Sequence, residues 1–180
     1  LTVALNCRCF HTKQTYEEDV LGIGINLGFT QSGLLQYVDS PLDLISKTAF
    51  DEGVRVGVWH KPFEFFLPLY INKMHASRAV PLLEKSILTI YQNVEIVGTS
   101  RYWVTLFVDL LCKLMSSMIV EIMKDNLHAS FVALEGYCYF HRWLIYLCET
   151  YPQNVQLAID NAIQKFVSSE SQRCKEVRPN

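Results

Sequence analysis

The sequence predicts a mainly α-helical fold: an antiparallel helical bundle or stacked helical hairpins, about five to six helices in all, with a small N-terminal β-hairpin. Three observations support this prediction. Strict period-two alternation of apolar residues is concentrated before residue 30. Apolar residues recur at helical spacing through most of residues 81–167. The links between the last three helical segments are only a few residues long, which makes neighbouring helices antiparallel.

Two segments alternate as β-strands do. Residues 1–11 place on one face Leu1, Val3, Leu5, Cys7, Cys9 and His11. Residues 20–27 form a second strand, with leucine and isoleucine on one face and Gly22 and Gly24 on the other. Small residues on a strand face let another element approach closely. We therefore expect residues 1–38 to form a β element that packs on the helical part.

The first helix is predicted to begin at Ser40-Pro41 and to end at Gly53. Serine is a favourable N-cap, proline suits the first helical position, and glycine suits the position after a helix. Residues 54–58 alternate briefly and predict a short strand or an extended linker. Because proline interrupts helices, Pro81 is expected to separate a helix over 69–79 from one over 81–94.

The longest predicted helix covers residues 101–125 and is apolar around most of its circumference. Its narrow polar stripe includes Asp109, Lys113 and Glu121. A charged residue near a bilayer centre costs about 2.5–3.5 kcal/mol on the insertion scale. We therefore expect the buried central helix of a soluble protein and no membrane span.

Two further helices complete the predicted bundle, which spans residues 39–170. The helix over 127–149 is expected to turn inward Phe131, Leu134, Cys138, Trp143 or His141, and Ile145. The last helix opens at Pro152 and is expected to pack on the core through Val155, Ala158, Ile159, Ala162, Ile163, Phe166 and Val167. Residues 171–180 are charged and are expected to be a frayed tail or a linker.

Composition and charge restrict the class of protein. Half of the residues are hydrophobic and 19% are charged, below the usual quarter. With no initiator methionine, this balance favours one domain excised from a larger protein. Net charge is −2 and no basic cluster exists, so nucleic-acid binding is not expected. The six cysteines do not resemble a disulfide scaffold, which favours free thiols in a reducing, cytoplasmic compartment.

Two cysteine–histidine patterns are candidates for chemistry. Cys7, Cys9 and His11 share a strand face, but zinc needs a fourth ligand and convergence of side chains that are spaced along the strand. Cys138 and His141 share a helix face, where an imidazole would activate a thiolate. Aromatic neighbours of Cys138 favour core packing instead. We therefore expect no catalytic residue, no metal and no cofactor, and keep both clusters as alternatives.

The segment from Trp59 to Lys73 is the favoured interaction surface. It is rich in aromatic residues beside a few polar ones, as interface hot spots are. The surface is predicted to comprise Trp59, His60, Phe63, Phe65, Tyr70 and Lys73. The alternative is that this segment anchors the domain's own core. His75, just downstream, is expected on a helix surface.

The function predicted from these patterns is non-catalytic. We expect a protein–protein interaction or scaffolding domain of a larger intracellular protein, with another protein or sister domains as its partner. Two alternatives are kept: an enzyme domain whose cysteine or zinc site is assembled from remote residues, and a helical pocket for an apolar ligand.

Overall fold

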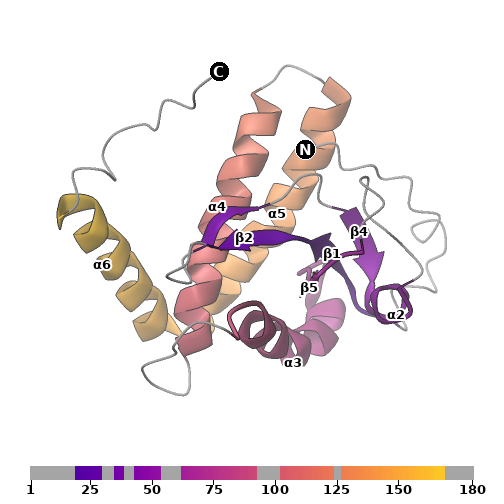
Figure 1. Ribbon diagram of the computed structural model, residues 1–180, viewed down its shortest axis with the longest axis horizontal. Coiled ribbons are helices and arrows are strands. Elements are labelled where there is room, and N and C mark those ends of the chain that lie inside the picture. Colours follow the sequence, from indigo (N-terminus) through magenta and orange to yellow (C-terminus); the bar gives the residue numbers. More distant parts are fainter. Residues whose placement is uncertain are drawn as a thin grey trace.

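The computed structural model describes residues 19–29, 35–38, 43–53, 62–92, 102–123 and 127–168. Within these ranges the chain is mainly helical and carries a small antiparallel sheet, which confirms the predicted fold class (Figure 1). The elements in chain order are β1 (Leu21–Ile25), β2 (Leu27–Phe29), β3 (Leu35–Val38), β4 (Asp43–Ser46), α2 (Lys47–Asp51), β5 (Phe65–Pro68), α3 (Lys73–Ile90), α4 (Tyr102–Ile122), α5 (Leu127–Thr150) and α6 (Pro152–Ser168). The strand predicted over 1–11, the segment 54–58 and the tail 171–180 lie outside the described residues.

The sheet is built around β1. Its strand order is β4-β1-β5, with both neighbours antiparallel to β1, while β2 and β3 form a separate antiparallel pair. The strand predicted over 20–27 is confirmed as β1 and the start of β2. Its partners β4 and β5 come from after residue 38, so the sheet joins the N-terminal segment to the helical part.

The glycines of β1 make room for aromatic rings. A Cβ atom placed on Gly22 would lie 2.4 Å from Cζ of Phe66 and 2.6 Å from the carbonyl oxygen of Leu67. A Cβ atom placed on Gly24 would lie 2.4 Å from Cγ of Phe63. The expectation that the small face of this strand admits a close neighbour is thus confirmed, and the neighbours are β5 itself and Phe63, which precedes it.

The predicted start of the first helix is wrong. Residues 43–46 form β4, which pairs with β1 so that Asp43 faces Gly24 and Ser46 faces Leu21. The helix begins only after Ser46, whose Oγ accepts a hydrogen bond from the Ala49 amide at 3.2 Å. The expected end is confirmed, because Gly53 follows α2 with a φ of 62°. Pairing with β1 thus outweighs the helix-start signal at Ser40-Pro41.

The predicted break at Pro81 is also wrong. Helix α3 runs without interruption from Lys73 to Ile90 with Pro81 inside it, and Asn72 caps its start. Proline removes one helical hydrogen bond and crowds the preceding turn. Residues on both sides of it are completely buried, namely Ala79, Leu83 and Ile87. Burial of this apolar face offsets the proline, which lies on the exposed side of the helix.

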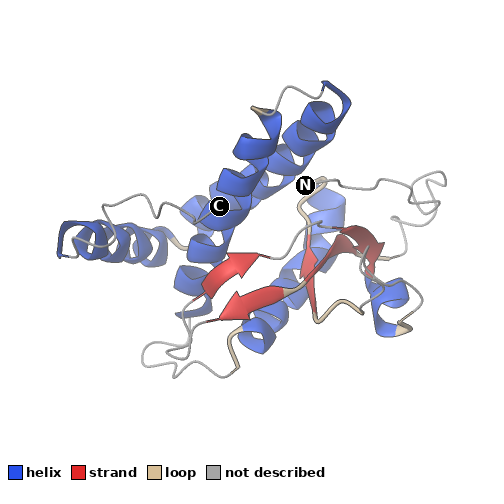
Figure 2. Cartoon of the chain, turned by 45° about the horizontal axis from the view of Figure 1, so that its top comes forward, coloured by secondary structure: helices blue, strands red, loops and turns tan. Residues whose placement is uncertain are grey.

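Helix α4 is the central helix of the bundle. It contacts α5 along most of its length and also contacts α3 and α6. Its buried side chains include Phe107, Leu110, Leu111 and Leu114. By length and composition alone, the segment Tyr102–Val120 is apolar enough to cross a membrane, and 44% of that window is buried within the protein. Figure 2 shows the strands on one side of the α4–α5 pair, with α6 extending away on the other.

Trp143 of α5 connects the helices to the sheet. Its side chain is completely buried, and its Nε1 donates a hydrogen bond of 2.9 Å to the carbonyl oxygen of Pro68 at the end of β5. The rings of Tyr70 and Phe107 meet the indole edge-on, at centroid distances of 5.2 and 6.1 Å. The inward face of α5 is therefore formed by Phe140, Trp143 and Leu147.

The predicted inward face of α5 is wrong, with one exception. Among the predicted residues whose side chains the structure describes, only Trp143 is buried. Leu134, Cys138, His141 and Ile145 are exposed. Helix α5 has apolar residues on two faces, so periodicity alone does not orient it. The face with the larger aromatic side chains is the buried one, because it removes more apolar area from water.

Candidate functional site

Part of the predicted interaction surface packs against the protein's own core. Phe63, Phe65 and Tyr70 are half-buried and contact core residues, and the Tyr70 ring contacts the rings of Trp143 and Tyr146. Lys73 is exposed at the start of α3. Trp59 and His60 lie outside the described residues. The assignment of this segment as an interaction surface stays a prediction.

The candidate chemical clusters are not assembled in the described part of the chain. Cys7, Cys9 and His11 lie outside it, so the metal alternative stays untested. No group of three His, Cys, Asp or Glu side chains within the described ranges is placed to hold a metal ion. Cys138 and His141 are both exposed on α5, and the His141 ring stacks on Tyr137 at 6.0 Å. The expectation that Cys138 points into the core is therefore wrong.

His75 is buried rather than placed on a helix surface as expected. Only 1% of it is exposed, and its Nε2 accepts a hydrogen bond of 2.8 Å from the Leu21 amide of β1. Burial, together with the nearby positive charge of Arg78, lowers the pKa of His75 to about 4. The neutral imidazole thus links α3 to β1. This is a structural role, which the amphipathic pattern of α3 did not reveal.

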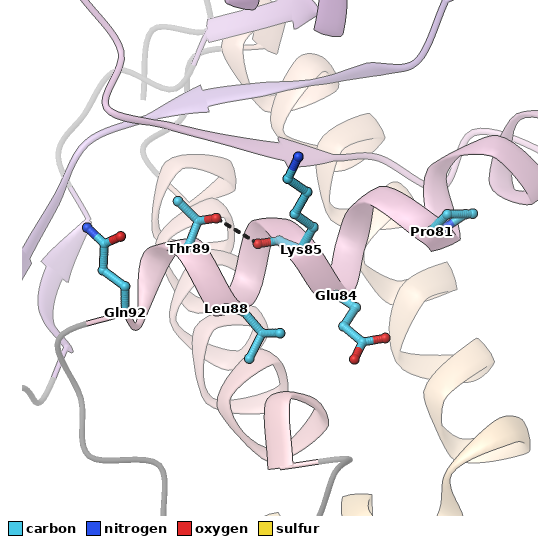
Figure 3. A pocket seen from close by; sticks show the side chains of 6 residues that line it. All are labelled: Pro81, Glu84, Lys85, Leu88, Thr89 and Gln92. Carbon is cyan, nitrogen blue, oxygen red and sulfur yellow. Dashed lines mark hydrogen bonds between the residues drawn. The ribbon is translucent and has the colours of Figure 1, made fainter.

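A shallow depression of about 460 Å³ lies along the outer side of α3 (Figure 3). Its lining consists of Pro81, Glu84, Lys85, Leu88, Thr89 and Gln92, all from α3 and the turn that follows it. The side chains drawn in Figure 3 spread along the exposed side of one helix rather than enclosing a space. The depression does not lie between the helices of residues 101–149, where the apolar-ligand alternative expects a pocket.

The outer face of α5 carries a regular row of exposed side chains, which we call the outer seam. It consists of Leu134, Cys138, His141, Ile145 and Cys148, at successive spacings of four, three, four and three residues. This is the spacing of the residues that meet in coiled coils. Leu134 is 49% exposed and Ile145 is 45% exposed. All the seam residues except Cys148 are ones that the sequence pattern had assigned to the core.

The apolar stripe of α6 is only partly covered. Val155 and Ala158 are buried where α6 meets α4, as predicted. Further along, Ile159 is 44% exposed and Ile163 is 55% exposed, and the whole segment 161–168 is exposed. The prediction that the full stripe packs on the core is therefore wrong. The helix diverges from the bundle after its first turns (Figure 1), so its later turns have no described element beneath them.

Comparison with known proteins assigns no family to this chain. No family model, no curated protein and no solved structure matches it. Large apolar side chains are exposed on both α5 and α6, namely Leu134, Ile145, Ile159 and Ile163.

Proposed function

We propose that this chain is a non-catalytic protein–protein interaction domain and that α6 docks its partner. The observation that carries the proposal is the exposure of Ile159 and Ile163. They lie four residues apart on one face of a helix, continuing a stripe that begins as core. Burying an isoleucine side chain is worth about 1.5–3 kcal/mol, so a partner that covers both gains substantial affinity.

The side chains around this stripe indicate the chemistry of the partner. Amides predominate beside it, with Gln156 and Gln164 exposed, and Gln156 donates a hydrogen bond of 2.9 Å to Asp160. Amides do not select a strongly charged ligand. The partner that suits α6 is therefore the apolar face of an amphipathic helix, from another protein or from a sister domain.

The exposed thiols are consistent with a reducing, cytoplasmic setting for this interaction. Cys112, Cys138 and Cys148 are free and exposed. Free surface thiols oxidise readily in oxidising compartments and persist where glutathione and thioredoxin keep them reduced. We include an intracellular location in the proposal on this ground.

Site-specific photo-crosslinking tests the proposed role of α6. A photoreactive phenylalanine is placed at Ile163 or, as the matched control, at the exposed Asn161, which lies about 200° around the same helix from Ile163. After irradiation in expressing cells, the Ile163 position should give a discrete protein adduct that the added substitution Ile159→Asp abolishes. Equal adducts from both positions, or none from Ile163, would refute a docking role for this stripe.

A further inference from the structure

Charged residues recur beside the outer seam of α5 with the same seven-residue period as the seam itself. Glu135, Arg142 and Glu149 are exposed and follow each other at seven-residue intervals, each directly after a seam residue. They therefore lie along the same flank of the seam, and their charges alternate in sign. In coiled coils, charged residues at such flanking positions set partner choice and orientation.

This pattern is self-complementary only when two copies of α5 run antiparallel. In one antiparallel register, Leu134 of one copy lies beside Ile145 of the second copy, and Cys138 lies beside His141. Two-fold symmetry makes each of these contacts occur twice. The same register brings Glu135 of each copy to Arg142 of the other, because flanking positions of one kind meet across an antiparallel pair. Opposite charges thus meet twice.

A parallel pair lacks this complementarity. It would place each seam residue against its own equivalent, with His141 against His141 and Cys138 against Cys138. Arg142 would face the position of Tyr137 in the other copy, which provides no carboxylate. The flanking charges therefore favour the antiparallel arrangement over the parallel one.

We propose that the outer seam of α5 is a self-association surface that pairs antiparallel with a second copy of this chain. Glu135 and Arg142 can form this pairing in addition to the hydrogen bonds that they already make. Glu135 accepts a hydrogen bond from the Tyr139 hydroxyl at 2.6 Å through one oxygen, and Arg142 donates to the Ile71 carbonyl through one of its several N–H groups. The surface lies on a different helix from the α6 stripe, so it goes beyond the proposed function.

Charge exchange tests the pairing. Sedimentation velocity of the full chain, at roughly 1–300 µM to cover the weak range expected for a small interface, should show a monomer–dimer equilibrium. Glu135→Arg should raise the dimer Kd about tenfold, since it turns two attractions into repulsions. The double variant Glu135→Arg/Arg142→Glu should return it to within about threefold of the original. Glu149→Arg is the matched control, because it makes the same charge change with no Arg142 opposite, and it should shift the Kd less than Glu135→Arg.

Three results would overturn the proposal: a monomer at every concentration, a double variant no better than Glu135→Arg, or equal effects of Glu135→Arg and Glu149→Arg. Thermal melts by circular dichroism accompany each variant, because Arg142→Glu also removes the contact with Ile71. The relative orientation of the two copies is determined in a separate experiment, by mild oxidation of the unmodified protein. The antiparallel register predicts no Cys138–Cys138 disulfide between copies, and peptide mapping that finds this disulfide would refute it.

Discussion

Two surfaces of helix α5 show how this protein divides its apolar residues. On the inner face, Trp143 is completely buried and joins the helix to the end of β5 through a hydrogen bond. On the outer face, Ile145, two residues later, is 45% exposed in a row with Leu134. The inner face specifies the fold, and the outer face presents similar side chains to solvent at the spacing that partner helices use.

The same division separates the junction of α3 and β1 from the later turns of α6. His75 buries a polar group at that junction and satisfies its Nε2 with the Leu21 amide. Helix α6 instead leaves Ile159 and Ile163 exposed once it has passed α4. Buried polar contacts between distant parts of the chain hold the fold together, whereas the uncovered apolar stripes are the parts that we propose to bind partners.

The largest expected effect comes from removing Trp143. Trp143→Ala should lower the free energy of unfolding by about 3–5 kcal/mol, because a buried aromatic residue and its contacts are lost. Trp143→Phe should cost about 1–3 kcal/mol, since the buried carbonyl of Pro68 loses its donor. Urea denaturation measures both. Ile145→Ala on the outer face is the control, with an expected change within about 0.5 kcal/mol; a loss as large as that of Trp143→Phe would erase the difference between the two faces.

The glycines of β1 should tolerate substitution less than the glycine of α5. Gly22→Ala is expected to cost about 1–3 kcal/mol, because its Cβ would lie 2.6 Å from a backbone oxygen and 2.4 Å from a ring. Gly136→Ala meets only the flexible end of Met118, at 3.1 Å, and alanine gains helix propensity of about 1 kcal/mol. Thermal denaturation compares the two variants. A stabilised Gly22→Ala variant would show that β1 and β5 are not this close.

Acid should weaken the junction between α3 and β1. The pKa of His75 falls from its usual 6.5 to about 4 in the folded protein, so the unfolded chain binds more protons between these pH values. The contribution of His75 to the free energy of unfolding is therefore complete above pH 6.5. It is lost as the pH falls toward 4, by at most about 1.4 kcal/mol per pH unit. Among the charged groups, Arg78 lowers the pKa of His75 and Asp19 raises it.

Replacement of the imidazole checks this pH dependence. Denaturation of the unmodified protein and of His75→Gln is compared from pH 7 down to pH 4. The variant should start less stable and should show a shallower decline over this range. Parallel declines in the two proteins would mean that His75 does not titrate as its burial requires.

The smallest expected effect concerns thiol reactivity. Although part of Cys112 is exposed, partial burial of its thiol raises the thiol pKa, and the negative charge of Asp109 raises it further. Cys138 on the outer seam should therefore react faster than Cys112 with a thiol reagent at neutral pH, by about two- to tenfold. Peptide mapping after brief labelling measures the two rates. A Cys138 that reacts only after denaturation would contradict its exposed position.

The sequence predicted the helices more reliably than the faces they bury. The stripe of α6 was recognisable, but a pattern shows which face is apolar and not whether anything covers Ile163. Strand β4 was missed because four residues are too few to show alternation, and the helix signal at Ser40-Pro41 lay just before it. Burial of His75 was missed because its partner, the Leu21 amide, lies 54 residues away in the sequence.

The double variant Leu134→Ala/Ile145→Ala separates folding from association most directly. Its free energy of unfolding is measured by urea denaturation at low concentration, and its dimer Kd by sedimentation. We expect a change in stability within about 1 kcal/mol and a loss of dimer affinity of at least about tenfold. A stability loss of several kcal/mol with unchanged association would show that these side chains belong to the core of the protein rather than to its binding surface.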